Sequence, residues 1–201
     1  MTIYPDPKWE TIAPADAGFD PAALEAAHQW QEARTEDPRY AQYRTLIVRD
    51  GRIVAEWNHG LDHTYEARLA SATKSIFSSI LGIVIAEGTI PSADTKLVDL
   101  YPEAMDVPEG EGPKANRHAF PANREITLRQ LISNTSGYMK PGEEPGQVFH
   151  YQTYGMNVLT HAIAKAHDLY SIEDPEGSPG LKVLIDEKLK EPIGATWSYY
   201  L

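Results

Sequence analysis

An apolar helix predicted over residues 71–87 constrains the fold of this chain more than any other feature. Its apolar side chains recur at helical spacing, and Gly88 follows as a stop signal. They are Ile76, Phe77, Ile80, Leu81, Ile83, Val84 and Ile85. A stripe this wide must be covered by other elements, so we expect the helix to lie in the core of a mainly helical region.

A helix and a β-hairpin are predicted before this core helix. Asp20-Pro21 is a helix start, with Asp as N-cap and Pro at the first helical position, and the helix is expected to run to about residue 34. Residues 44–49 and 52–57 are typical of strands, and Asp50-Gly51 between them is a hairpin turn signal. Alternation places Ile53 and Trp57 on one face of the second strand.

The rest of the chain is expected to be mostly helical. Helices or helical turns are predicted at residues 94–100, 127–133, 154–167 and 182–190, with a turn at 134–137. Residues 102–123 form a long loop rich in Pro, Gly and Glu, of the kind that serves as a lid or is disordered. The predicted class is α/β (α+β): an antiparallel sheet flanked by helices within residues 1–70, and a mainly helical lobe over residues 71–201.

The core helix opens with Ser71-Ala72-Thr73-Lys74. Side chains three positions apart share one face of a helix, so the Lys74 amine can reach the Ser71 hydroxyl and take its proton. A lysine accepts a proton only in its neutral form, which burial or the positive end of a helix favours. The spacing by itself is common, and it also fits a solvent-facing serine and lysine on an ordinary helix.

The sequence around this motif resembles a known superfamily at four places in the same order. A hairpin and then Ser-Ala-Thr-Lys come first, followed by a helix with a Thr-Ser-Gly turn at residues 128–138. Residues 149–155 look like the segment that carries a Tyr-x-Asn motif, and residues 191–196 resemble a Pro-Leu-Gly-Met segment. The chain resembles the serine β-lactamases, penicillin-binding proteins and related esterases. This resemblance implies one β-lactamase-like domain and an acyl-enzyme hydrolase that needs no cofactor or metal.

The resemblance also implies roles for individual residues. Ser71 is the nucleophile, Lys74 is its activating base, and Tyr151 shuttles the proton between them and the leaving group. The alternative for Tyr151 is a ring in the core with its hydroxyl at the surface. His150 adjoins Tyr151 and is expected either to line the substrate cleft or to be solvated beside it. Thr153 is assigned to substrate binding because it takes the place of the family asparagine.

Thr153 is a departure from the family pattern that affects the expected substrate. It offers a hydroxyl where the family has an amide, which weakens the hydrogen bonds expected to a β-lactam side chain. An esterase or amidase is therefore favoured over an efficient β-lactamase. Residues around Glu56-Trp57 and 71–75 also look similar to the branch that contains 6-aminohexanoate-dimer hydrolases, which cleave short linear amides and some esters.

A second departure is the lack of the family's third motif. No Lys-Thr-Gly or His-x-Gly triplet follows Tyr151, although in the family that strand supplies one backbone donor to the oxyanion hole. The strands that continue the family sheet are also not evident, and one hairpin alone is marginally stable. We hypothesise that residues 1–201 are the N-terminal part of the domain, either a fragment or one chain of a cleaved or split enzyme. A C-terminal companion chain would complete the fold.

Composition excludes several classes of function. The formal net charge of −11 makes nucleic acid an unexpected partner, and the absence of cysteine removes disulfides and thiolate chemistry. No signal-peptide core or membrane-length apolar stretch is seen, which predicts a cytoplasmic protein without a membrane partner. His59 and His63 have a metal-ligand spacing but are interpreted as surface histidines. The acidic residues 103–111 and 173–174 are predicted to be solvated loops.

The sequence therefore predicts a serine hydrolase that cleaves a small-molecule carboxylic ester or amide. Two alternatives stay open. One is a β-lactamase or D-alanyl-D-alanine carboxypeptidase, which the missing export signal disfavours. The other is a non-catalytic binding protein on the same scaffold, which Thr153 and the missing third motif allow. The acyl group, the leaving group and the oligomeric state do not follow from the sequence.

Overall fold

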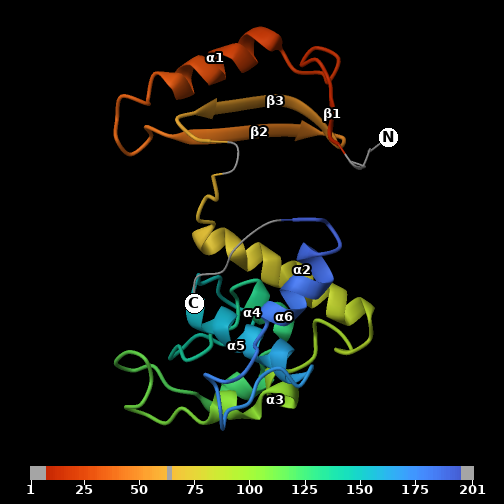
Figure 1. Cartoon of the computed structure of the whole chain (residues 1–201). Helices are drawn as coiled ribbons and strands as arrows, with labels where there is room; N and C mark the ends of the chain where they lie inside the picture. The colour runs from red at the N-terminus through yellow and green to blue at the C-terminus, as the bar shows by residue number, and fades with distance from the viewer. Residues whose placement is uncertain (1–7, 63–64, 196–201) are drawn as a thin grey trace. The chain divides into compact units, whose positions relative to one another are not determined.

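The computed structural model describes residues 8–62 and 65–195. The chain divides into two compact units, Met1–Ala67 and Arg68–Leu201 (Figure 1). The first unit holds a small sheet and one helix, and the second is built from helices and loops. That both belong to one domain remains a prediction.

The sheet of the first unit contains β1 (Glu10–Thr11), β2 (Tyr43–Arg49) and β3 (Arg52–His59) in the order β1-β3-β2. β2 and β3 form the predicted antiparallel hairpin, with Thr45 opposite Trp57. Asp50 and Gly51 have φ values of 52° and 81°, the two positive values that the tight hairpin turn requires. β1 pairs with β3 in parallel, so the sheet is mixed, whereas the sequence predicted an antiparallel one.

Helix α1 (Pro21–Glu32) covers one face of this sheet (Figure 1). It begins as predicted, because the Asp20 side chain accepts hydrogen bonds from two backbone N–H groups of the first turn, at 2.8 and 3.3 Å. The His28 ring stacks on Trp57 of β3 with centroids 4.6 Å apart. Gln31 donates a 2.9 Å hydrogen bond to Thr45 of β2. These polar and aromatic contacts fix α1 on the strands.

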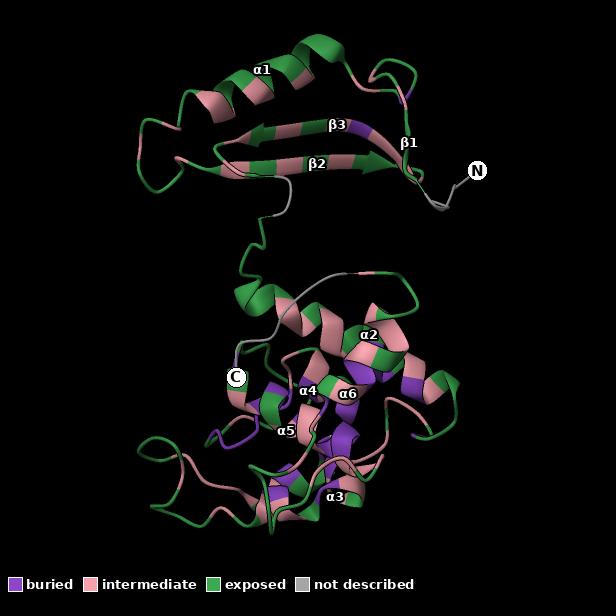
Figure 2. Cartoon of the chain, in the orientation of Figure 1, coloured by how far each residue is buried: buried purple, intermediate pink, exposed green. Residues whose placement is uncertain are grey.

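The opposite face of the sheet is uncovered by the described residues of this unit. Leu46 and Val48 of β2 are 50% and 40% exposed. Among the described residues of the unit, Ala17 and Val54 are the hydrophobic residues that are buried. The first unit therefore buries little apolar surface of its own (Figure 2).

The second unit consists of short helical elements around two longer helices. The longer ones are α2 (Thr73–Ala86) and α5 (Thr153–Lys165). The shorter ones are η1 (Ala70–Ala72), α3 (Leu97–Leu100), η2 (Pro102–Met105), η3 (Pro121–Glu125), α4 (Leu128–Ile132), α6 (Lys182–Ile185) and the π-helical turn η4 (Asp186–Lys190). Most of these match predicted helical segments with boundaries shifted by a few residues, but η2 and most of η3 lie within residues 102–123, which were predicted to be a loop.

The core of the molecule lies in this second unit, where the buried residues gather around α2, α5 and α6 (Figure 2). Ile80 and Val84 of α2, and Leu159 and Ile163 of α5, have no exposed surface. α2 ends where predicted: Gly88 has a φ of 83°, and the N–H of Thr89 returns to the Val84 carbonyl at 3.1 Å. The predicted apolar stripe is thus the core of the helical unit.

Glu103 corrects one prediction about the long acidic loop. It lies in η2 and forms an ion pair with Lys165 at the end of α5, with Nζ and Oε1 2.5 Å apart. Hydrogen bonding from Lys165 holds the pKa of Glu103 below its usual range. The expectation that residues 103–111 form a solvated loop is therefore wrong at this position, because Glu103 ties two elements of the core together.

None of the helices within residues 8–62 and 65–195 combines the length and the apolar character needed to cross a bilayer.

Candidate active site

Ser71 lies in the turn that leads into α2. The prediction placed it on the α-helix, but it occupies the 3₁₀ turn η1, and the α-helix starts two residues later at Thr73. Ala70, immediately before it, has a φ of 44°. This left-handed conformation costs roughly 1–2 kcal/mol for a residue with a Cβ. Residues with strained backbone conformations are common at active sites, where the strain is part of how a side chain is positioned.

Lys74 contacts Ser71 as the motif predicts. Its Nζ lies 3.1 Å from the Ser71 Oγ, within hydrogen-bonding distance. The 3₁₀ turn η1 continues directly into α2, so Ser71 and Lys74 lie on successive turns of one continuous helix. The serine is exposed and the lysine is half-buried. The nucleophile and its candidate base are therefore in contact, and the hydroxyl is open to a small molecule.

Tyr151 joins this pair from a distant part of the chain. The Lys74 ammonium lies 5.2 Å from the centroid of the tyrosine ring. Hydrogen bonding from the Ser71 side chain, followed by hydrogen bonding from Lys74, lowers the pKa of the Tyr151 phenol, and the positive charge of Lys74 acts in the same direction. Tyr151 is 51% exposed, which rules out the alternative of a ring in the core. Both neighbours favour the phenolate, which is a proton acceptor.

His150 and Thr153 flank Tyr151 without joining the Ser71–Lys74 pair. The His150 side chain is 47% exposed, and its Nδ1 lies 2.8 Å from the Glu143 Oε1. Thr153 is the first residue of α5 and is exposed. The structure thus shows a histidine that is paired with a carboxylate beside the site. The expected substrate-binding roles of both residues remain predictions.

The sequence did not indicate two polar residues near His150, namely Lys140 and Glu143. Lys140 is 4% exposed and faces Glu143 with Nζ and Oε1 3.8 Å apart. Burial lowers the pKa of Lys140, and the attraction of Glu143 offsets part of that shift. These residues follow the Thr-Ser-Gly turn, but no local pattern indicates that a lysine there would be buried.

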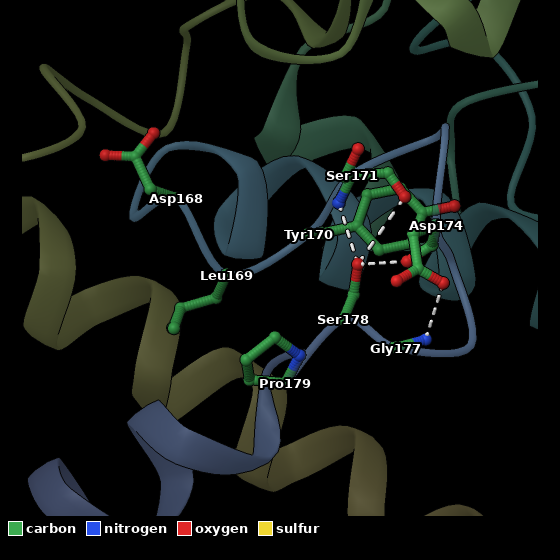
Figure 3. Close-up of a pocket in the computed structure, with 8 residues that line it drawn as sticks. All are labelled: Asp168, Leu169, Tyr170, Ser171, Asp174, Gly177, Ser178 and Pro179. Atoms are coloured by element: carbon green, nitrogen blue, oxygen red, sulfur yellow. Dashed lines mark hydrogen bonds between the residues drawn. The ribbon is translucent and has the colours of Figure 1, made fainter.

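The structure also contains a surface pocket of about 390 Å³ (Figure 3). It is formed by the loop after α5, between Asp168 and Pro179. The Ser178 hydroxyl donates to the Asp174 carbonyl at 2.7 Å, and the Asp174 side chain accepts from the N–H of Gly177 at 3.0 Å. Its polar groups therefore stabilise the loop itself. Ser71, Lys74 and Tyr151 do not line it.

Among the described residues, no three His, Asp or Glu side chains converge on a point where a metal ion could bind. His59 is a partly exposed residue whose Nδ1 lies 3.1 Å from Glu32, so its interpretation as a surface histidine is confirmed. His63 lies outside the described residues.

A protein-family model matches most of the chain. The family model described as Beta-lactamase matches residues 29–198, which include Ser71, Lys74 and Tyr151. The chain belongs to the Beta-lactamase family. No curated protein matches it.

Membership of the Beta-lactamase family confirms the predicted resemblance and the mixed α/β fold class. The match extends across both compact units, from α1 to beyond the last described residue. It supports a serine-hydrolase-like fold in general. The substrate, the acyl-enzyme chemistry and the role of each residue lie beyond what a family match contains.

Proposed function

We propose that this protein is a serine hydrolase that cleaves a carboxylic ester or amide through an acyl-enzyme at Ser71. The observation that supports this most strongly is the 3.1 Å distance between Lys74 Nζ and Ser71 Oγ, on a strained turn that is open to solvent. A hydroxyl needs an adjacent proton acceptor to act as a nucleophile, and the amine is at the required distance.

The first half of the reaction forms the acyl-enzyme. The Ser71 Oγ bonds to the carbonyl carbon while its proton passes to the Lys74–Tyr151 pair, and the carbonyl electrons move onto the oxygen. When the tetrahedral intermediate collapses, the bond to the leaving group breaks, and the leaving group takes a proton through Tyr151. The lowered pKa of Tyr151 suits this relay, because its phenolate is available to accept the proton.

The second half releases the acyl group with water. Water gives a proton to the same pair and adds its oxygen to the acyl carbon. The ester bond to Ser71 then breaks, and the Ser71 oxygen recovers a proton. The backbone N–H of Ser71 is proposed as one donor to the developing oxyanion. A C-terminal companion chain is proposed to supply the second donor, in place of the third motif that does not follow Tyr151.

An intact mass spectrum after treatment with a fluorophosphonate probe tests the proposal. We expect one adduct on the wild-type protein and none on Ser71→Ala. Ser78→Ala, which alters another exposed serine on α2, serves as the matched control and should label normally. An adduct that persists in Ser71→Ala would reject Ser71 as the nucleophile. If the 201-residue chain does not label, the same experiment is repeated with the C-terminal companion chain added.

Substrate class is then measured with three probes: an aryl ester, a short linear amide and a chromogenic cephalosporin. We expect turnover of the ester or the amide, and turnover of the cephalosporin alone would favour a β-lactamase. Binding of all three without turnover or labelling would favour the non-catalytic binding protein. The cytoplasmic location expected from the sequence remains a prediction.

A further inference from the structure

The segment that carries Tyr151 lies outside the helices and strands of the fold. Residues 148–152 have no regular secondary structure and precede the start of α5 at Thr153. The position of the Tyr151 hydroxyl therefore depends on hydrogen bonds from this segment to its neighbours. A displacement of about 1 Å in a reacting group can cost on the order of 100-fold in rate, so these bonds bear directly on the proposed chemistry.

One residue, Asn134, bonds to the backbone on both sides of Tyr151. Its carbonyl oxygen accepts a hydrogen bond from the N–H of His150 at 2.8 Å. Its side-chain Oδ1 accepts one from the N–H of Gln152 at 3.2 Å. The two bonds hold the residues before and after Tyr151, which restricts rotation of the backbone at the tyrosine itself.

The backbone conformation of Asn134 makes this double contact possible. Its φ of 57° is left-handed, which asparagine tolerates better than most residues with a side chain. The N–H of Asn134 donates to the carbonyl of Leu131 in α4 at 3.1 Å, and the Leu131 side chain is 1% exposed. Asn134 is thus anchored to the core of the helical unit. A glycine could adopt the same backbone shape, but it would lack the second acceptor.

We propose that Asn134 is a positioning residue for Tyr151, and this inference rests on the proposed function. It connects the rigid core at α4 to the backbone on both sides of the tyrosine and so fixes the phenol beside Ser71 and Lys74. Two further bonds act on the same neighbours. Gln152 donates to the Ser136 hydroxyl at 3.2 Å, and His150 pairs with Glu143. Within the described part of the chain, Asn134 hydrogen-bonds to the backbone N–H of both neighbours.

Asn134→Gly tests the role of the amide side chain with little effect on the backbone, because glycine accepts a positive φ. Asn116→Gly is the matched control, since Asn116 has a φ of 59° and lies in an exposed loop. We expect Asn134→Gly to label at Ser71 with the fluorophosphonate roughly 10–100-fold more slowly. Asn116→Gly should label at the wild-type rate. Asn134→Asp, which keeps the acceptor oxygen, should recover labelling to within about threefold.

A double-variant comparison separates positioning from a general structural effect. In a Tyr151→Phe background, Asn134→Gly should slow labelling no further, because its effect acts through the tyrosine hydroxyl. Tyrosinate absorbance, taken as the difference from Tyr151→Phe, should also show the titration midpoint of Tyr151 moving toward that of an ordinary tyrosine in Asn134→Gly. This readout does not require a functional nucleophile.

The failures of the two proposals can be told apart. If Tyr151→Phe labels as fast as the wild type, the proposed proton relay fails. If Tyr151→Phe is slow while Asn134→Gly is not, the positioning role of Asn134 is overturned and the relay stands. If the titration midpoint of Tyr151 is the same in Asn134→Gly as in the wild type, the positioning role of Asn134 is overturned. This outcome can be read even if the protein does not label. Should Asn134→Gly fail to fold, Asn134→Ser replaces it, since the serine oxygen lies one bond short of the amide oxygen.

Discussion

Lys74 Nζ and Ser71 Oγ lie 3.1 Å apart, with the serine on a 3₁₀ turn and the lysine in the first turn of α2. The two elements form one continuous helical path, so the contact is set by the backbone rather than by a flexible loop. A hydroxyl beside an amine on a rigid element is the arrangement that a serine nucleophile needs.

Substitution of Lys74 should therefore slow the reaction of Ser71 strongly. Lys74→Met keeps the length of the side chain but removes the amine, and we expect labelling by a fluorophosphonate to fall by about 10²–10⁴-fold. Lys114→Met, at an exposed position in the loop before η3, is the control for loss of a positive charge. Equal labelling of Lys74→Met and the wild type would show that the amine does not activate Ser71.

The pH dependence of labelling should report the ionisation of Tyr151. Hydrogen bonding from Ser71, followed by that from Lys74, lowers the pKa of Tyr151, so the phenolate forms below the ordinary value near 10. Labelling should rise as the pH increases through this lowered pKa. In Lys74→Met the tyrosinate midpoint should move upward, because one hydrogen bond and one positive charge are lost. A midpoint that stays in place in Lys74→Met would contradict the assignment of the shift to Lys74.

Local signals explain which parts of the fold were predictable. Asp20 and Thr127 begin helices as expected, because a capping side chain bonds to backbone N–H groups only two or three residues away. Asp50-Gly51 forms the expected hairpin turn for a similar reason, since its two positive φ values favour those residue types. These features depend on neighbours in the sequence, which a single sequence contains in full.

Features set by distant contacts were predicted less well. The left-handed φ of Ala70 has no sequence signal, because alanine disfavours that conformation and tertiary contacts must impose it. Glu103 was interpreted as solvated, yet its partner Lys165 lies 62 positions further along the chain. The meeting of Tyr151 with Lys74 was expected only from the family resemblance, since spacing within one helix cannot indicate it.

Protonation of His161 should make the helical unit less stable at mildly acid pH. Its ring stacks on Tyr170 with centroids 4.2 Å apart, and burial lowers its pKa below the ordinary value. The unfolded chain therefore binds a proton more readily than the folded one. This contribution to stability is complete above the unfolded pKa of about 6.5 and is lost as the pH falls through it toward the folded pKa.

Urea denaturation at pH 7.5 and at pH 5.5 measures this effect. The free energy of unfolding should fall at the lower pH, and the fall should be smaller in His161→Phe, which keeps the stacked ring but cannot be charged. In His161→Phe the free energy of unfolding should still fall somewhat at the lower pH because of His167. Burial, followed by the charge of Lys188, also lowers the pKa of His167. If His161→Phe loses as much stability as the wild type on acidification, His161 is not the group responsible.

Two Gly→Ala substitutions should have opposite effects on stability. Gly82 lies in α2 with no heavy atom within 4 Å of an added Cβ, so Gly82→Ala restricts the unfolded chain at no steric cost. It should raise the free energy of unfolding by about 0.5–1 kcal/mol. Gly137 has a φ of 61°, and its added Cβ would meet the Glu143 carbonyl oxygen at 2.3 Å. Gly137→Ala should therefore destabilise the protein by about 2–3 kcal/mol.

The two variants also separate stability from positioning at the candidate active site. The Glu143 backbone must move to admit a Cβ at Gly137, and the Glu143 carboxylate pairs with His150 next to Tyr151. Gly137→Ala should therefore slow fluorophosphonate labelling even at a temperature where it remains folded, whereas Gly82→Ala should not. Labelling of folded Gly137→Ala at the wild-type rate would show that the loop around Glu143 moves independently of Tyr151.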